Sequence, residues 1–385
     1  MSQRTESPAA GAHTAPANPL LPTYEGDFVL PGRLQLDCGR ALTTPTLHYA
    51  RYGQLNAARD NVVLACHALS GSAQVGAWWP GLFTHNRAHK EIGKSGLLDP
   101  EQDCVICINM LGSCYGSTGP GSVNPDTGRA YGPDFPLISI RDNVRAQSQL
   151  LLSLGIAQLR LVLGASIGAM QALEWAILYP ERVERALILA VAPLNAYGIG
   201  LNHLQRRAIE TDPQWQCGNY SPQNPPWRGL ALARQIAMIS YKSPQLFASR
   251  FGRKPNRNGE DPWGLDESGG GLNAGRFDIG GYLDHQGEVF HNRFDANSYL
   301  AILRTMETWD PSLGFASTEA ALQRIQAELT FVGIRSDNLF PAADVHQLAQ
   351  AAVAAGVKAV YLEMDSDHGH DAFLAEEETL FRLLS

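Results

Sequence analysis

The chain has 385 residues, 44% of them hydrophobic, and a formal net charge of −8 at pH 7. This composition excludes a disordered chain, and the length predicts either one large domain with an insertion or two domains. An acidic chain without a basic block argues against nucleic acid or an anionic membrane as a partner, and no apolar run has membrane-spanning length.

The six cysteines are too few and too scattered to predict a disulfide framework, and we recognise no secretory signal. Cys104 and Cys107 have C-x-x-C spacing, but they lie in a strand-like run that would point their side chains to opposite faces, and a second C-x-x-C is missing. We interpret the cysteines as small buried side chains, not as metal or redox ligands. We therefore expect a cytoplasmic protein without a metal site.

The first half of the chain reads as the beginning of an α/β core. Residues 1–18 are rich in small residues, proline and threonine without periodicity, which predicts a disordered tail. Residues 19–192 are expected to form the first part of the core, and short apolar runs predict its early strands over 28–30, 47–52 and 62–66.

Two loops at strand ends are candidates for a ligand-facing side. The segment 67–72 consists mostly of small residues whose backbone N–H groups stay accessible, as an oxyanion site requires. A further strand over 103–109 leads into the loop 111–122, which is rich in glycine and hydroxyl groups. That composition is typical of a ligand-facing loop and equally of a plain surface loop.

The next segment carries the candidate nucleophile. A helix is predicted over 140–154, followed by a strand over 159–163. The strand runs into Gly164-Ala-Ser166-Ile-Gly168 and then into good helix formers. In such a G-x-S-x-G elbow the glycines let strand and helix approach closely, so that the serine hydroxyl stands above the sheet edge near the helix N-terminus.

Beyond a strand over 186–190 the alternation of strands and helices breaks. Residues 193–314 contain proline-, glycine- and asparagine-rich stretches with helical segments such as 229–241 and 297–308, which predict a helical lid inserted over the sheet edge.

Residues 315–385 resume the core. They contain predicted strands over 328–333 and 359–364 and helices over 342–355 and 373–384. We therefore expect an α/β fold, with a mostly parallel sheet, helices on both faces and an inserted lid.

The loops after the two late strands contain the other groups that a catalytic triad needs. In hydrolase-type α/β folds the acid and then the histidine follow the serine in the chain. Asp337 lies after the first late strand, and His368 and His370 lie together after the second. The spacing alone does not choose between the two histidines.

Several motifs together resemble the homoserine O-acetyltransferase family of α/β-hydrolase-fold enzymes, over nearly all of the chain after the tail. They are His67-Ala-Leu-Ser-Gly-Ser, Leu111-Gly-Ser-Cys-Tyr-Gly-Ser-Thr-Gly-Pro, Gly164-Ala-Ser-Ile-Gly-Ala-Met-Gln-Ala-Leu-Glu-Trp, Ala233-Arg-Gln-Ile-Ala-Met-Ile-Ser-Tyr and Gly369-His-Asp-Ala-Phe-Leu.

The resemblance implies a role for each matching residue. Ser166, Asp337 and His370 would form the triad, which selects the second histidine of the pair. The remaining assignments are the oxyanion-hole amides of Leu69 and Ile167, and the groups that bind the amino acid substrate, Arg234 for its carboxylate and Asp371 for its ammonium.

The resemblance also implies the reaction. Acetyl-CoA would acylate the serine, and L-homoserine would then accept the acetyl group in a ping-pong cycle of methionine biosynthesis. It requires no cofactor and no metal, and it implies a homodimer joined through the lid helices.

The chain departs from the family pattern at Ile167-Gly168-Ala169, where Met-Gly-Gly is usual, and at Gln74, where histidine is usual. Relatives that use succinyl-CoA tend to have an arginine at the position of Leu339, which favours acetyl here. The alternatives are an O-succinyltransferase acting on homoserine or serine, a serine O-acyltransferase, an esterase or thioesterase, and a non-catalytic binding protein.

Overall fold

The computed structural model describes residues 20–83, 96–263 and 275–385. The tail predicted over 1–18 lies outside these residues. The helices that were described are all too short or too polar to cross a membrane.

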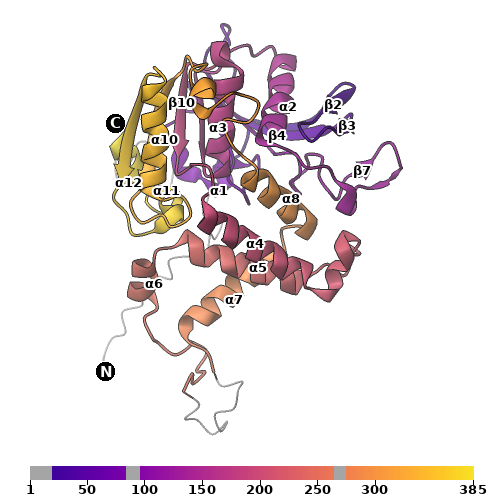
Figure 1. Ribbon diagram of the computed structural model, residues 1–385, viewed down its shortest axis with the longest axis vertical. Coiled ribbons are helices and arrows are strands. Elements are labelled where there is room, and N and C mark those ends of the chain that lie inside the picture. The colour runs from indigo at the N-terminus through magenta and orange to yellow at the C-terminus, as the bar shows by residue number, and fades with distance from the viewer. Residues whose placement is uncertain (1–19, 84–95, 264–274) are drawn as a thin grey trace.

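An eight-stranded sheet forms the centre of the described structure, in the order β1-β4-β6-β5-β9-β10-β11-β12 (Figure 1). The strands are β1 (Tyr24–Val29), β4 (Thr46–Tyr52), β5 (Val62–Cys66), β6 (Cys104–Ile108), β9 (Leu161–Ala165), β10 (Arg185–Leu189), β11 (Glu328–Ile334) and β12 (Ala359–Met364). Strands β1 and β4 pair antiparallel, β4 pairs antiparallel with β6, and every later pair in the sheet is parallel. The predicted mostly parallel sheet is confirmed.

Helices cover both faces of this sheet, as predicted. One face packs on α2 (Ile140–Ser153), α3 (Ile167–Leu178) and α10 (Ala342–Ala354), and the other packs on α1 (Val75–Trp78), α11 (Ala372–Ala375) and α12 (Glu377–Leu384). The central strands β5, β6 and β9 are buried along their whole length, because side chains on both of their faces contact helices. Their continuous apolar runs follow from this double burial.

The helices of the inserted region lie as a separate layer at one end of the sheet (Figure 1). They are α4 (Ala196–Glu210), α5 (Trp227–Tyr241), α6 (Pro244–Arg250), α7 (Asp278–His291) and α8 (Ala296–Glu307). Helices α4, α5 and α7 pack on one another, while α8 contributes Tyr299, Ile302 and Leu303 to the core of the sheet face that carries α3. Residues of α4, α5 and α7 belong to the same buried cluster, so the insertion packs on this side of the core through four of its helices.

A buried polar cluster joins helix α3 to residues 309–311, which follow the inserted helices. Glu174 of α3 is fully buried and accepts hydrogen bonds from Arg141 Nε and Trp309 Nε1, both at 3.1 Å. Arg141 also donates through Nη2 to the Pro311 carbonyl at 3.1 Å. Burial raises the pKa of Glu174 to about 7, although the guanidinium of Arg141 opposes that shift.

Two hairpins and several short helical turns complete the described secondary structure. The hairpins β2 (Arg33–Gln35) with β3 (Ala41–Thr43), and β7 (Val123–Asn124) with β8 (Arg129–Ala130), lie outside the main sheet. Short 3-10 turns and the helix α9 (Thr318–Leu322) connect the larger elements.

Two predictions about local structure need correction. The closing helix expected over 373–384 is two helices, because Glu376 has non-helical backbone angles, φ −130° and ψ 51°, and its carboxylate binds His368. Cys104 and Cys107 are buried on opposite faces of the sheet as expected, but Cys38 and Cys217 are exposed. These last two lie outside the packed strands, where the apolar pattern does not apply.

Candidate active site

Ser166 lies in a sharp turn between β9 and α3. Its backbone has φ 58° and ψ −129°, a left-handed conformation that is strained for a residue with a side chain. A Cβ on Gly164 would lie 2.3 Å from the carbonyl carbon of Gly168, and a Cβ on Gly168 would lie 2.2 Å from the Cys66 carbonyl oxygen. Both glycines are therefore required for the close packing of strand and helix that supports the turn.

The backbone amides of Leu69 and Ile167, the second of them adjacent to Ser166, have no hydrogen-bond acceptor within the described ranges. Ile167 is the first residue of α3, where an amide has no partner within the helix. Leu69 lies in the loop after β5, and like Ile167 it donates no hydrogen bond to another described residue. Both amides are thus available to an oxygen that develops negative charge.

His67 supports the loop that contains Leu69. Its ring is fully buried, Nδ1 is 2.8 Å from the Ala68 carbonyl oxygen, and Nε2 accepts from the Met110 amide at 3.0 Å. Because an amide only donates and a carbonyl only accepts, the ring must be neutral with its proton on Nδ1. Burial accordingly lowers the pKa of His67 to about 4.

Asp337 and His370 are in direct contact. His370 Nδ1 lies 2.7 Å from Asp337 Oδ2, and Asp337 Oδ1 accepts from the amides of Leu339 and Phe340 at 2.8 and 3.0 Å. Burial alone would lower the pKa of His370, but the adjacent Asp337 carboxylate outweighs this effect and holds the pKa above its ordinary value of 6.5. The carboxylate thereby fixes the ring orientation and stabilises its protonated form.

The neighbouring histidine has a different partner. His368 Nδ1 binds the Glu376 carboxylate at the break between α11 and α12, and His368 is absent from the cavity wall that contains Ser166. Geometry therefore separates two histidines that sequence spacing alone did not distinguish.

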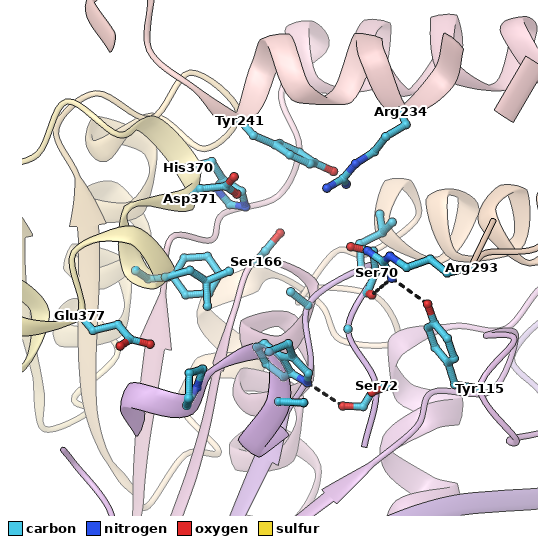
Figure 2. A pocket seen from close by; sticks show the side chains of 18 residues that line it. Ser70, Ser72, Tyr115, Ser166, Arg234, Tyr241, Arg293, His370, Asp371 and Glu377 are labelled. Atoms are coloured by element: carbon cyan, nitrogen blue, oxygen red, sulfur yellow. Dashed lines mark hydrogen bonds between the residues drawn. The ribbon is translucent and has the colours of Figure 1, made fainter. Parts of the chain in front are cut away.

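A cavity of about 460 Å³ joins these groups (Figure 2). Its wall contains residues from the loop after β5, from the elbow, from the inserted helices and from the C-terminal segment, namely Ala68, Leu69, Ser70, Gly71, Ser72, Ala77, Trp78, Pro80, Tyr115, Ser166, Arg234, Tyr241, Arg293, His370, Asp371, Phe373, Leu374 and Glu377. Ser166 and His370 share this wall, although no hydrogen bond joins them in the described structure. Catalytic hydrogen bonds are often long before substrate binds, so this geometry is compatible with a serine–histidine pair.

Arg234 and Asp371 approach the same cavity from different elements (Figure 2). Arg234 lies on α5, is 8% exposed, and places its guanidinium 4.9 Å from the centre of the Phe290 ring and 5.5 Å from that of Tyr241. Asp371 lies next to His370 at the start of α11. The two side chains form no ion pair with each other, and their opposite charges suit the two ends of a zwitterion.

Asp371 already has a cationic neighbour that the sequence did not suggest. Lys242 Nζ lies 2.9 Å from Asp371 Oδ2, and both side chains are largely buried. Burial would raise the pKa of Asp371, but Lys242 and then His370 and Arg234 reverse the shift and lower it. The carboxylate is therefore held in its charged form.

Three other wall residues also escaped the sequence analysis. Tyr241 lies between Arg234 and His370, with its ring centre 5.8 Å from that of His370. Tyr115 and Arg293 contact each other on the opposite side, where Arg293 Nη1 lies 2.7 Å from the Tyr115 hydroxyl (Figure 2). Tyr115 and Tyr241 stand within motifs that carry the family resemblance, but the sequence assigned them no role.

Within the described ranges, no group of three or more His, Cys, Asp or Glu side chains is arranged to hold a metal ion. The site described above consists of a serine, a histidine–aspartate pair, free amides and charged side chains.

Comparison with known proteins gave matches along most of the chain. A family model for the α/β hydrolase fold matches residues 61–377. The homoserine O-acetyltransferase of Symbiobacterium thermophilum is 44% identical over 360 residues, covering 91% of each chain, and that of Trichormus variabilis is 42% identical over 363 residues, covering 93% of this chain and 92% of the relative.

Solved structures of similar architecture include two kinds of enzyme. A homoserine O-acetyltransferase from Bacillus anthracis has a TM-score of 0.81 and 26% identity, covering 93% of this chain and 97% of its own. The esterase E22 has a TM-score of 0.80 and 26% identity, covering 93% of this chain and 99% of its own.

Proposed function

Because this chain belongs to the homoserine O-acetyltransferase family of α/β-hydrolase-fold enzymes, we propose that it transfers the acetyl group of acetyl-CoA to the side-chain hydroxyl of L-homoserine, a reaction of methionine biosynthesis. The observation that carries the proposal is one cavity in which Ser166 and His370 share a wall with Arg234 and Asp371. A nucleophile and a base are thus placed beside two opposite charges that suit a free amino acid.

In the first half of the proposed cycle the enzyme becomes acylated. His370, oriented by Asp337, takes the proton of Ser166 as Oγ attacks the thioester carbonyl. The amides of Leu69 and Ile167 stabilise the negative charge on the carbonyl oxygen. Collapse of the tetrahedral intermediate breaks the carbon–sulfur bond, and His370 returns the proton to the sulfur of the departing CoA.

In the second half homoserine takes the place of CoA. Arg234 binds its carboxylate and Asp371 its ammonium, which directs the side-chain hydroxyl toward the acetyl-serine. His370 removes the hydroxyl proton as the oxygen attacks, and then gives that proton to Ser166 Oγ when the ester bond to the enzyme breaks. The product is O-acetyl-L-homoserine, and the cycle needs neither a metal nor a cofactor.

Protonation of His370 sets the acid limit of this mechanism. Only the neutral ring can accept the serine proton, and the pKa of His370 lies above 6.5 because of Asp337. We therefore expect kcat/KM for acetyl-CoA to fall as the pH drops through a value above 6.5.

A hydrolase is the second candidate function, because the similar structure E22 is an esterase. The same triad would then pass the acyl group to water. The cavity contains Arg234 and also Asp371, which is paired with Lys242. These opposite charges favour the transferase, because an ester hydrolase that uses water as the acceptor does not need them.

The residue at position 339 bears on the identity of the transferred acyl group. Leu339 stands where succinyl-CoA-dependent relatives tend to have arginine, and in the structure it is buried and does not line the cavity. The position thus supplies no cation for a second carboxylate, which supports acetyl over succinyl as the transferred group.

The decisive experiment measures CoA release from acetyl-CoA or succinyl-CoA with L-homoserine, L-serine or no acceptor. We expect steady turnover only with acetyl-CoA and homoserine together, and we expect Ser166→Ala to lower kcat by roughly 10⁴-fold or more while keeping the fold. Equal release without acceptor would show a thioesterase, and preference for succinyl-CoA would contradict the argument from Leu339.

We further propose that the protein is a cytoplasmic homodimer joined through its lid helices. Large apolar side chains are exposed on the inserted helices, among them Leu204 on α4, Leu232 and Ile239 on α5, and Val289 on α7. Such side chains are typical of a surface that a second copy covers. Light scattering on the purified protein should give twice the chain mass, and a monomer would contradict this proposal.

A further inference from the structure

Two arginines face the cavity without an acidic partner. Neither Arg234 nor Arg293 forms an ion pair with any carboxylate in the ranges that the structure describes. Arg206 and Arg276, also in the inserted region, pair with Glu307 and Asp284 respectively. Two guanidinium groups without an ion-pair partner on one cavity wall repel each other, and an anion that contacts both of them relieves this repulsion.

The two guanidinium groups are close to the same aromatic side chain. Arg293 lies 5.1 Å and Arg234 lies 4.9 Å from the centre of the Phe290 ring. One face of Phe290 is covered by Phe294, whose ring is nearly parallel at 5.1 Å. Figure 2 shows the Arg234 side chain extending toward the space above Ser166, and the Arg293 guanidinium beside Ser70. The arginines come from separate elements, α5 and the turn between α7 and α8, and meet only in the folded protein.

Arg293 is also held in place by hydrogen bonds. Its Nη1 donates to the Ser70 carbonyl at 3.0 Å and to the Tyr115 hydroxyl at 2.7 Å. These contacts use a single nitrogen, so Nε and Nη2 keep their N–H groups for another acceptor. Burial raises the pKa of Tyr115, and the charges of Arg293 and Arg234 both oppose that rise, which places both cations near the same hydroxyl.

The balance of charge on the wall indicates which end of the substrate these cations bind. Asp371 forms an ion pair with Lys242. The group proposed to bind the substrate ammonium is therefore a single carboxylate that already has a cationic neighbour. On the carboxylate side there are two guanidinium groups that form no ion pair within the described ranges, and Asp371, the carboxylate whose pKa Arg234 lowers, is already paired with Lys242. The site is therefore biased toward recognition of the acceptor's carboxylate.

We propose that Arg293 binds the carboxylate of the acceptor amino acid together with Arg234, and that this second guanidinium determines the preference for an acceptor with a free carboxylate. The inference rests on the proposed acetyl transfer to homoserine. Arg293 also supports the loop that contains Leu69, because its side chain donates a hydrogen bond to the carbonyl of the next residue, Ser70. If Arg293 only supported this loop, its substitution would change the rate of acylation and leave the preference between acceptors unchanged.

The test compares Arg293→Gln and Arg293→Lys with the wild type in two separate steps. Single-turnover CoA release from acetyl-CoA without acceptor reports acylation. Steady-state kinetics with L-homoserine, or with L-homoserinamide, in which a neutral amide replaces the carboxylate, report acceptor recognition. Arg253→Gln is the matched control, because Arg253 is an exposed lid arginine over the Phe277 ring, outside the cavity.

With Arg293→Gln we expect KM for homoserine to rise about 10-fold or more, and the preference for homoserine over homoserinamide to fall by a similar factor. Acylation should change by less than about 3-fold, Arg293→Lys should keep part of the preference, and Arg253→Gln should match the wild type.

Slower acylation with an unchanged preference for the carboxylate would overturn the inference and leave Arg293 as a support for Ser70 alone. A wild type that does not distinguish homoserine from homoserinamide would overturn it too. Wild-type turnover that needs no acceptor would refute the proposed acetyl transfer itself. Failure of the proposed function is thereby distinguished from failure of the inference about Arg293.

Discussion

His67 makes the stability of the protein depend on pH in a way that can be calculated. In the folded protein its ring is neutral, because Nε2 accepts from the Met110 amide and burial lowers its pKa to about 4. In the unfolded chain the same ring has an ordinary pKa of 6.5. Between these two values the unfolded chain binds a proton that the folded protein does not, so the free energy of unfolding falls as the pH decreases.

The size of the effect follows from the two pKa values. A difference of one pKa unit corresponds to about 1.4 kcal/mol, so His67 alone should remove about 3 kcal/mol of stability between neutral pH and about pH 4. This loss is a substantial fraction of the roughly 5–15 kcal/mol that stabilises most domains.

The assay is urea unfolding of the wild type and of His67→Gln at a series of pH values and one protein concentration. Glutamine does not titrate, so the variant should be the less stable protein at neutral pH, but the difference between the two proteins should shrink by about 3 kcal/mol as the pH is lowered to about 4. Unfolding curves that stay the same distance apart would refute the assignment of a neutral, buried His67. The other histidines cancel in this comparison.

Two further substitutions test other parts of the site, and a third serves as a control. Lys242→Met removes the cation that offsets the effect of burial on Asp371, so the pKa of that carboxyl should rise. We then expect KM for homoserine to increase as the pH is lowered from about 8 to about 6. A pH dependence of KM like that of the wild type would contradict the pairing. Gly168→Ala should destabilise the protein by roughly 2–3 kcal/mol or prevent folding, because its Cβ would meet the Cys66 carbonyl oxygen at 2.2 Å. Gly200→Ala is its matched control and should raise the unfolding temperature slightly, since the exposed helical site has no atom within 4 Å of the new Cβ, and equal destabilisation of both variants would refute the steric argument.

Local chemistry explains why much of the site could be predicted from the sequence. The elbow around Ser166 leaves a pattern because only glycine fits at positions 164 and 168, where the strand, the helix and the end of β5 touch. The double burial of β5 and β9 likewise leaves continuous apolar runs that mark them as central strands. These constraints act between residues that are close in sequence or in one repeating element.

The contacts that could not be predicted depend on the tertiary arrangement. Lys242 and Asp371 are far apart in the chain, and their pairing requires the end of α5 to lie beside the C-terminal segment. Arg293 follows α7 as one of many surface-type arginines, and only the folded protein brings it to Ser70. The break at Glu376 has a local cause, since its partner His368 is only eight residues away, but helical periodicity within 373–384 does not register that contact.

The buried cluster of Glu174, Arg141 and Trp309 limits how far this architecture can be simplified by protein engineering. Trp309 and the Pro311 carbonyl belong to the segment that follows the inserted helices, whereas Glu174 lies on the helix that begins directly after Ser166. If the lid were deleted together with residues 309–311, Glu174 would lose the hydrogen bond from the Trp309 indole and Arg141 would lose the Pro311 carbonyl. The ion pair of Glu174 and Arg141 would then stay buried without all of its hydrogen-bond partners. Deletion of the lid should therefore be designed to retain residues 309–311, or to replace Glu174 and Arg141 together by apolar residues of similar volume.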